Sequence, residues 1–139
     1  MLATGEEIFR LIPQRPPMVM VDALYEADAE GGETGLTVKE DNVFCIDSQL
    51  IEPGIIEHSA QVRPHSPVTD IFWRGEEPHI GLIGEIKSFR IERKPAVGET
   101  LKTRVAVVGE AMGMSLVQTE TFSGGEKIAG GQIKIFIVD

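Results

Sequence analysis

The order of hydrophobic and polar positions separates one segment with helical periodicity from a series of segments with the character of β-strands. The helical segment reads IEPGIIEHSAQ over residues 51–61. Pro53 has its φ angle preset for a first helical turn, and Glu52 before it can cap the helix and complement its dipole. The apolar or small residues that recur at helical spacing are Ile55, Ile56, Ser59 and Ala60. We therefore predict a buried helix that starts at Pro53.

The rest of the chain reads mainly as strands. Residues 4–12 predict a short capped helix that Pro13 ends. The apolar run 18–25 predicts a first strand, and residues 34–39, after a glycine-containing turn, predict a returning strand. Further β-rich segments cover residues 80–86, 88–93, 101–109, 114–122 and 127–138, with Gly124-Gly125 as the last hairpin turn. This order predicts an α+β fold in which an antiparallel sheet curls around one helix.

Two prolines limit the length of the central helix. Pro64 and Pro67 follow it, and a proline inside a helix costs ~3 kcal/mol or more. We therefore predict that the helix kinks or stops near Arg63 and that residues 68–73 form a second helical segment, ended by Gly75.

Composition and charge exclude several classes of function. A length of 139 residues with 42% hydrophobic content fits a single domain over residues 1–139. The formal net charge of -9 argues against nucleic acid or an anionic membrane as a partner. The single cysteine, Cys45, excludes an internal disulfide, and the acidic N-terminus with Glu6 and Glu7 does not fit a leader segment. No apolar stretch approaches the ~20 residues that a membrane helix needs, so we predict a cytoplasmic protein.

The helical segment resembles the central helix of the hotdog-fold 3-hydroxyacyl-ACP dehydratases of the FabA and FabZ type. In that family the helix begins with Pro-Gly, here Pro53-Gly54, and carries an acidic residue four positions before a glutamine, here Glu57 and Gln61. Residues 11–22 (LIPQRPPMVMVD), 84–90 (GEIKSFR) and 95–101 (PAVGETL) are similar to three further family motifs in the same order. The resemblance implies a hotdog fold, a thioester substrate on acyl carrier protein or CoA, and no cofactor or metal. It also implies a homodimer or larger assembly, or a heterodimer with a second hotdog subunit.

The catalytic histidine of that family is missing from this chain. The dehydratases carry it in a Gly-His-Phe-Pro-Gly loop before the helix, whereas residues 43–50 here read VFCIDSQL. The histidine of the family's opening motif is likewise replaced, by Gln14. In this respect the chain is similar to the divergent dehydratase-like proteins of aryl-polyene and flexirubin pigment clusters.

Dehydration of a 3-hydroxyacyl thioester needs a base, an acid and donors for the enolate oxygen. Glu57 is the predicted acid, because burial beside Ile55 and Ile56 would keep a proton on its carboxyl, although helix glutamates are often solvated. Free N–H groups near Gly54 could bind the thioester carbonyl. The resemblance adds Gln61 to the predicted substrate-binding residues.

The base has two weaker candidates within the chain. Asp47 and Cys45 lie where the loop histidine would be, and Asp47 could act as the base. The alternative is that Asp47 is a turn residue and Cys45 a small core residue, as such residues more often are. His58 follows Glu57 but points about 100° away around the helix, so a hydrogen-bonded structural histidine is the alternative. His65 and His79 read as surface residues, and their spacing resembles no metal site.

Basic residues gather in one part of this acidic chain. They are Lys87, Arg90, Arg93 and Lys94. Because carrier proteins and CoA are anionic, we predict the carrier contact here, with ordinary solvated strand charges as the alternative.

Three functions remain open at this point. The first is a dehydratase with Glu57 as acid, impaired by the absent histidine. The second is a hotdog thioesterase in which one carboxylate activates water, and the third is a non-catalytic subunit of a hetero-oligomeric dehydratase.

Overall fold

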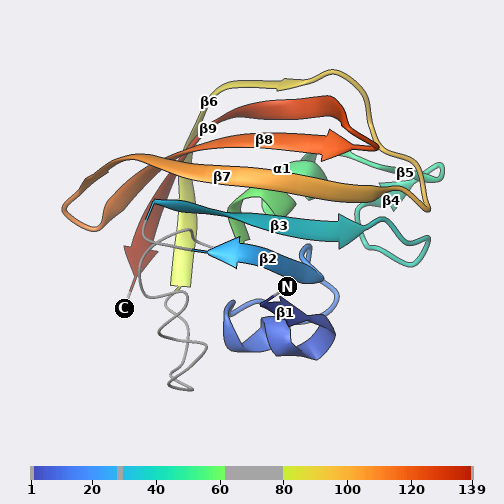
Figure 1. Ribbon diagram of the computed structural model, residues 1–139, viewed down its shortest axis with the longest axis horizontal. Coiled ribbons are helices and arrows are strands. Elements are labelled where there is room, and N and C mark those ends of the chain that lie inside the picture. The colour runs from blue at the N-terminus through green and yellow to red at the C-terminus, as the bar shows by residue number, and fades with distance from the viewer. Residues whose placement is uncertain (1, 28–29, 62–79, 139) are drawn as a thin grey trace.

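The computed structural model describes residues 2–27, 30–61 and 80–138. Its main feature is a seven-stranded sheet with the order β1-β2-β3-β7-β8-β9-β6, in which every neighbouring pair is antiparallel. Figure 1 shows this curved sheet in front of the helix α1 (Glu52–Gln61), which lies against its inner face. The strands of this sheet are β1 (Ala3–Thr4), β2 (Ala23–Ala27), β3 (Gly31–Thr37), β6 (Ile80–Ile91), β7 (Thr100–Ala111), β8 (Met114–Ser123) and β9 (Glu126–Val138). The remaining elements are a 3₁₀ helix η1 (Gly5–Arg10) and a small hairpin of β4 (Cys45–Ile46) and β5 (Gln49–Leu50).

Helix α1 starts within one residue of the predicted position. Ile55 is fully buried among the side chains between the helix and the sheet, while Ile56 and Ala60 are half-buried and pack against Val105 and neighbouring apolar residues. Burial of one apolar stripe against a sheet is what stabilises a helix this short, because isolated helices of about 10 residues are marginal in water. The prediction of a central buried helix is confirmed, and the sheet is curled around it as expected.

Three strand boundaries differ from the prediction. Residues 18–22 are not part of the sheet, and β2 begins only at Ala23, because side chains of α1 bind the backbone of Met18 and Met20. The two expected segments 80–86 and 88–93 are one strand, β6, whose pairing with β9 is irregular near Ser88, a residue with φ of +50°. Strand β3 starts at Gly31, earlier than expected, where the glycines allow close backbone approach: a Cβ on Gly32 would lie 2.8 Å from the carbonyl oxygen of Glu26.

Other local predictions hold. The N-terminal helix is a 3₁₀ helix that ends at Arg10, before Pro13, and the N–H of Thr4 donates to Glu7 Oε1 at 3.1 Å as in a capping box. The hairpin between β8 and β9 turns at Gly124 and Gly125, both with positive φ. The predicted helix stop at Arg63, the second helical segment 68–73, and the positions of His65 and His79 lie outside the described residues. Among the described helices, none is long and apolar enough to cross a membrane.

Candidate functional site

The candidate site is built on one face of α1 by Glu57 and Gln61, which lie one helical turn apart. Glu57 is half-buried, and its Oε2 accepts a hydrogen bond from Gln61 Nε2 at 3.2 Å. Residues at i and i+4 are neighbours on a helix surface, so this contact follows directly from the sequence spacing. The carboxyl of Glu57 therefore has a fixed donor beside it and stays partly open to an incoming group.

Gln61 is held in place by the extended segment that precedes β2. Its Nε2 also donates to the carbonyl oxygen of Met18 at 2.6 Å, and its Oε1 accepts from the N–H of Met20 at 2.7 Å. The Gln61 side chain is buried, and each of its polar atoms has a protein partner. In this arrangement Gln61 orients Glu57, which differs from the direct substrate contact that the resemblance implied.

His58 follows Glu57 in the helix and points about 100° away from it, into the core. Its Nδ1–H donates to the carbonyl oxygen of Met20 at 2.8 Å, and its Nε2 therefore accepts from Thr103 Oγ1 at 2.8 Å. Thr121 Oγ1 lies 2.7 Å from Thr103 Oγ1 and donates to it, which completes a chain of three hydrogen bonds. Burial lowers the pKa of His58 to about 4, against the smaller opposing effect of the Met20 carbonyl. His58 is thus neutral at physiological pH with both ring nitrogens occupied, which favours the structural alternative considered for it.

The N–H of Gly54 itself is occupied, so the binding of a thioester carbonyl by N–H groups near Gly54 stays a prediction. This N–H donates to the carbonyl oxygen of Ile51 at 2.9 Å, within the first turn of α1. A side chain at this position would be excluded, because a Cβ would lie 2.7 Å from Leu50 Cδ1 and 2.8 Å from Phe44 Cβ. Gly54 therefore allows the helix start to pack closely on the segment before it.

The segment without histidine forms the β4–β5 hairpin. Asp47 and Ser48 form its two-residue turn with φ of 52° and 62°, and the side chain of Asp47 is exposed. Both central residues of this turn type need positive φ, a region in which aspartate is tolerated better than most residues. The hairpin is fixed to the turn after β6, since Leu50 N–H donates to Pro95 O and Val97 N–H donates to Ser48 O, both at 2.9 Å. Cys45, in strand β4 of this hairpin, is half-buried, and burial together with the charge of Glu40 raises the pKa of its thiol.

The four predicted carrier-binding cations lie on β6 and just after it, each with a carboxylate partner. Lys87 pairs with Glu85 at 3.7 Å, Arg90 with Glu92 at 3.4 Å, and Lys94 with Glu52 at 3.9 Å. Arg93 differs from the other three. Its guanidinium binds both oxygens of Glu99 at 2.8 and 3.0 Å and also Glu126 at 3.1 Å.

Glu99 connects this guanidinium to two other elements. It also accepts from Ser123 Oγ at 2.6 Å and from the N–H of Ala96 at 2.6 Å. The Arg93 contact, followed by these two, lowers the pKa of Glu99 to about 2. Arg93 and Glu99 therefore fasten the turn that carries the β4–β5 hairpin.

Sequence reasoning missed the polar residues that surround α1 from the sheet. Thr103 and Thr121 face each other across β7 and β8 and point inward, at positions where the burial pattern alternates. The alternation of these strands gives the inward face, but His58, which the Thr103 hydroxyl contacts, is 45 residues away in the chain. Among the described residues, no group of three or more His, Cys, Asp or Glu side chains is arranged to hold a metal ion.

Comparison with known proteins agrees with this fold. Residues 6–139 match the model of the ApeP-like family, described as ApeP dehydratase. The chain belongs to the ApeP-like dehydratase family. It is also 25% identical over 146 residues to the 3-hydroxyacyl-[acyl-carrier-protein] dehydratase FabZ of Acetivibrio thermocellus, covering 99% of this chain and 97% of that protein. The FabZ of Herpetosiphon aurantiacus is 27% identical over 144 residues, covering 99% and 100%.

Solved structures share the hotdog fold of this ApeP-like dehydratase. The dehydratase heterocomplex ApeI:P from Xenorhabdus doucetiae matches with a TM-score of 0.82 and 17% identity, covering 94% of this chain and 90% of that one. A hypothetical thioesterase with coenzyme A from Streptococcus pneumoniae matches with a TM-score of 0.61 and 8% identity, covering 83% and 84%. The predicted hotdog fold and the relationship to FabZ-type dehydratases are confirmed, and the chain is a dehydratase-like protein.

Proposed function

We propose that this chain takes part in the dehydration of 3-hydroxyacyl thioesters, with Glu57 as the acid in a site completed by a second hotdog subunit. The observation that carries the proposal is the half-buried Glu57 carboxyl, held by Gln61 on the central helix of an ApeP-like dehydratase. The relatives named FabZ act on 3-hydroxyacyl groups linked to acyl carrier protein, which supports the same substrate class here.

In the proposed reaction a base removes a proton from C2 of the substrate. The electron pair of that C–H bond forms the C2=C3 double bond, and the C3–O bond breaks as protonated Glu57 donates its proton to the leaving hydroxyl. The products are the 2-enoyl thioester, water, the protonated base and the Glu57 carboxylate, so atoms and charges balance. A proton transfer from the base to Glu57 restores the starting state.

The base is proposed to come from the partner. His58 is the only histidine in the described part of the chain, and both of its ring nitrogens are hydrogen-bonded in the core. Asp47 remains the candidate within this chain, and its side chain stands on the exposed turn of the β4–β5 hairpin. A partner subunit that carries a loop histidine would supply the missing group.

The sheet offers a surface for such a partner. Strand β6 is the last strand of the sheet order and runs for 12 residues, so within the described residues one of its edges has no neighbouring strand. Long unpaired edges favour pairing with another chain. We propose assembly through β6, as a homodimer or with a different hotdog subunit, and a similar solved structure is indeed a dehydratase heterocomplex.

For the carrier contact we propose Lys87, Arg90 and Lys94. Their ion pairs are single contacts of 3.4 to 3.9 Å between half-exposed or exposed side chains, and such pairs contribute ~0–1 kcal/mol, so an anionic carrier can replace the present partners. Arg93, although predicted with them, is bound by two carboxylates and is better assigned to the hairpin turn.

The test compares the purified chain alone with the chain mixed with a histidine-bearing hotdog dehydratase subunit. A 3-hydroxyacyl thioester is supplied, and 2-enoyl product is measured. Because loss of a general base costs roughly 10²- to 10⁴-fold in rate, we expect weak turnover alone and recovery on mixing. Glu57→Gln should abolish the recovered activity while size-exclusion profiles stay unchanged, and Glu40→Gln, at an exposed carboxyl outside the proposed site, is the control.

Robust turnover by the isolated chain that survives Glu57→Gln would refute both the residue and the shared site. Release of free thiol from a saturated acyl thioester, without enoyl product, would instead indicate a thioesterase.

A further inference from the structure

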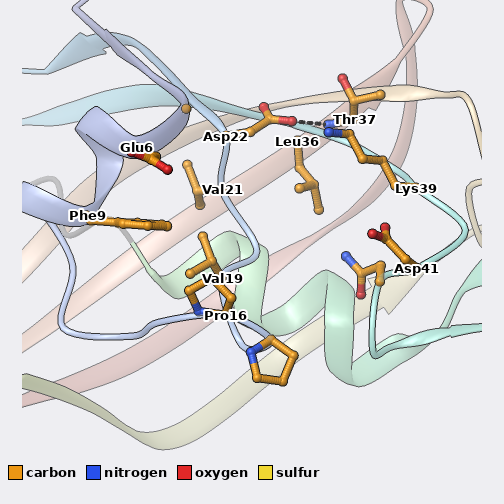
Figure 2. Close-up of a pocket in the computed structure, with 13 residues that line it drawn as sticks. Glu6, Phe9, Pro16, Val19, Val21, Asp22, Leu36, Thr37, Lys39 and Asp41 are labelled. Carbon is orange, nitrogen blue, oxygen red and sulfur yellow. Dashed lines mark hydrogen bonds between the residues drawn. The ribbon is translucent and has the colours of Figure 1, made fainter.

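A cavity lies beside the segment that holds Gln61, away from Glu57. Its volume is about 460 Å³, within the range of roughly 300–1,000 Å³ that small-molecule sites occupy. It is enclosed by η1 on one side, by the segment 16–22 in the middle, and by the end of β3 with residues 39–42 on the other (Figure 2). Neither Glu57 nor Gln61 lines it, so this cavity is separate from the candidate site.

The middle wall is shared with the site. The backbone of Met20 is bound by His58 and Gln61, and its side chain is buried in the core that contains Ile55. Because side chains of an extended segment alternate between its two sides, the neighbouring Val19 and Val21 face the other way and line the cavity. An occupant would therefore rest on the reverse side of the segment that positions Glu57 through Gln61.

The cavity has apolar walls and charged groups at one end. The apolar wall residues are Phe9, Pro16, Pro17, Val19, Val21 and Leu36. The polar end is formed by Asp22, Thr37, Lys39, Asp41 and Asn42, with Glu6 above Phe9 on η1 (Figure 2). This separation of apolar and polar surface suits a ligand with an apolar body and one charged head.

The charges at the polar end decide the sign of that head. Two carboxyl groups, from Asp22 and Asp41, and one ammonium group, from Lys39, line this end, and a third carboxyl, from Glu6, lines the cavity beside Phe9 (Figure 2). Asp22 Oδ2 accepts from the N–H of Thr37 at 2.8 Å, and burial raises the pKa of this half-buried carboxyl in spite of that bond and of Lys39. A cation placed beside Asp22 would relieve the cost of keeping this carboxylate in a partly desolvated position.

We propose that this cavity binds a small amphipathic cation, an alkyl or aromatic group with an ammonium head directed at Asp22 and Asp41. The proposal rests on the cavity, its apolar walls and its excess of carboxylates, and it does not depend on the proposed function.

The test uses three probes of equal chain length, octylammonium, octanoate and octanol, each below its micelle-forming concentration. Binding is followed by NMR titration of the labelled full-length protein, with the methyl groups of Val19 and Val21 and the amide of Thr37 as reporters. We expect octylammonium to shift these signals and to bind roughly tenfold or more tightly than octanoate or octanol, because a charge-assisted contact is stronger than a neutral one. The amide signals of Met20 and the Gln61 side chain should move in the same titration, since they share the middle wall.

Variants separate the ionic from the apolar contribution. Asp22→Asn keeps an acceptor for the Thr37 N–H while removing the charge, and Asp41→Asn removes the second charge; each should weaken octylammonium binding roughly threefold to tenfold and leave octanol unchanged. Glu40→Gln, an exposed neighbour outside the cavity, is the matched control and should change nothing. Val19→Phe should fill the cavity and remove binding of all three probes.

Three results would overturn the proposal. The first is binding of octanoate as tight as that of octylammonium. The second is a set of shifts scattered over the surface, unaffected by Val19→Phe. The third is the absence of any shift at millimolar octylammonium in a protein whose spectrum shows it to be folded.

Discussion

The buried histidine on α1 gives a pH dependence whose sign and size follow from the structure. His58 is 1% exposed, and its two hydrogen bonds require the neutral ring, with Nδ1–H donating to Met20 and Nε2 accepting from Thr103. Its pKa is about 4 in the folded chain, whereas an unfolded histidine titrates near 6.5. Between these values the unfolded chain binds a proton that the folded chain does not, so the free energy of unfolding falls as pH decreases.

The magnitude follows from the difference between the two pKa values. At 1.36 kcal/mol for each unit, full passage from pH 7 to below pH 4 would remove about 3 kcal/mol of stability, and about 2 kcal/mol of this would be lost by pH 5. The free energy of unfolding of a native protein is only about 5–15 kcal/mol, so this loss is easily measured.

The assay is urea unfolding at fixed protein concentration between pH 7 and pH 5, for the native chain and for His58→Gln. The variant is expected to be less stable at pH 7, because changing one partner disturbs buried hydrogen bonds worth ~1–3 kcal/mol, but its stability should fall less between pH 7 and pH 5. All other titrating groups are common to the two proteins, including Asp22, whose raised pKa favours the folded state as pH falls. Equal pH slopes for the two proteins, or an NMR titration of His58 near 6.5, would refute the reasoning.

Three further changes test the fold around the site. Ile55→Ala should cost ~2–5 kcal/mol in thermal or chemical unfolding because this side chain is fully buried, whereas Ile46→Ala, at a side chain 54% exposed, should change stability by no more than about 0.5 kcal/mol. Gly54→Ala should lower the free energy of unfolding by ~1–3 kcal/mol in the same assay, because its Cβ would lie 2.7 Å from Leu50 and 2.8 Å from Phe44 side-chain atoms. A gain in stability, as expected for alanine in an open helix, would contradict this close packing. Glu99→Gln should lower the amide-exchange protection factors of the β4–β5 hairpin by releasing Arg93. Protection relative to the intrinsic exchange rate should also fall in the native chain as pH falls from 4.5 toward 2, because the carboxylate with its lowered pKa loses its stabilising charge there. Unchanged protection in the variant would show that the hairpin does not depend on this network.

The sequence alone determined the features that depend on neighbouring residues. Pro53 fixes the φ angle of a helical start, and the spacing of Glu57 and Gln61 places them one turn apart whatever surrounds the helix. The β-rich composition of the segments between turn residues marked β7, β8 and β9, and Gly124-Gly125 marked their last turn. Together with the Pro-Gly and Glu-x-x-x-Gln pattern, these local signals were sufficient for the fold and the family.

The tertiary structure decided where hydrogen-bonding groups find their partners. His58 and Gln61 bind Met20 from 38 and 41 residues away, and these contacts remove residues 18–22 from the sheet. Met20 and Thr103 together occupy the two ring nitrogens of His58, a candidate base. Local patterns give the direction of a side chain but not the group that it meets, because loop closure brings together segments whose spacing carries no periodic signal. For the same reason, the pairing of Arg93 with Glu99 and Glu126, and the cavity between η1 and β3, became apparent only when the chain was folded.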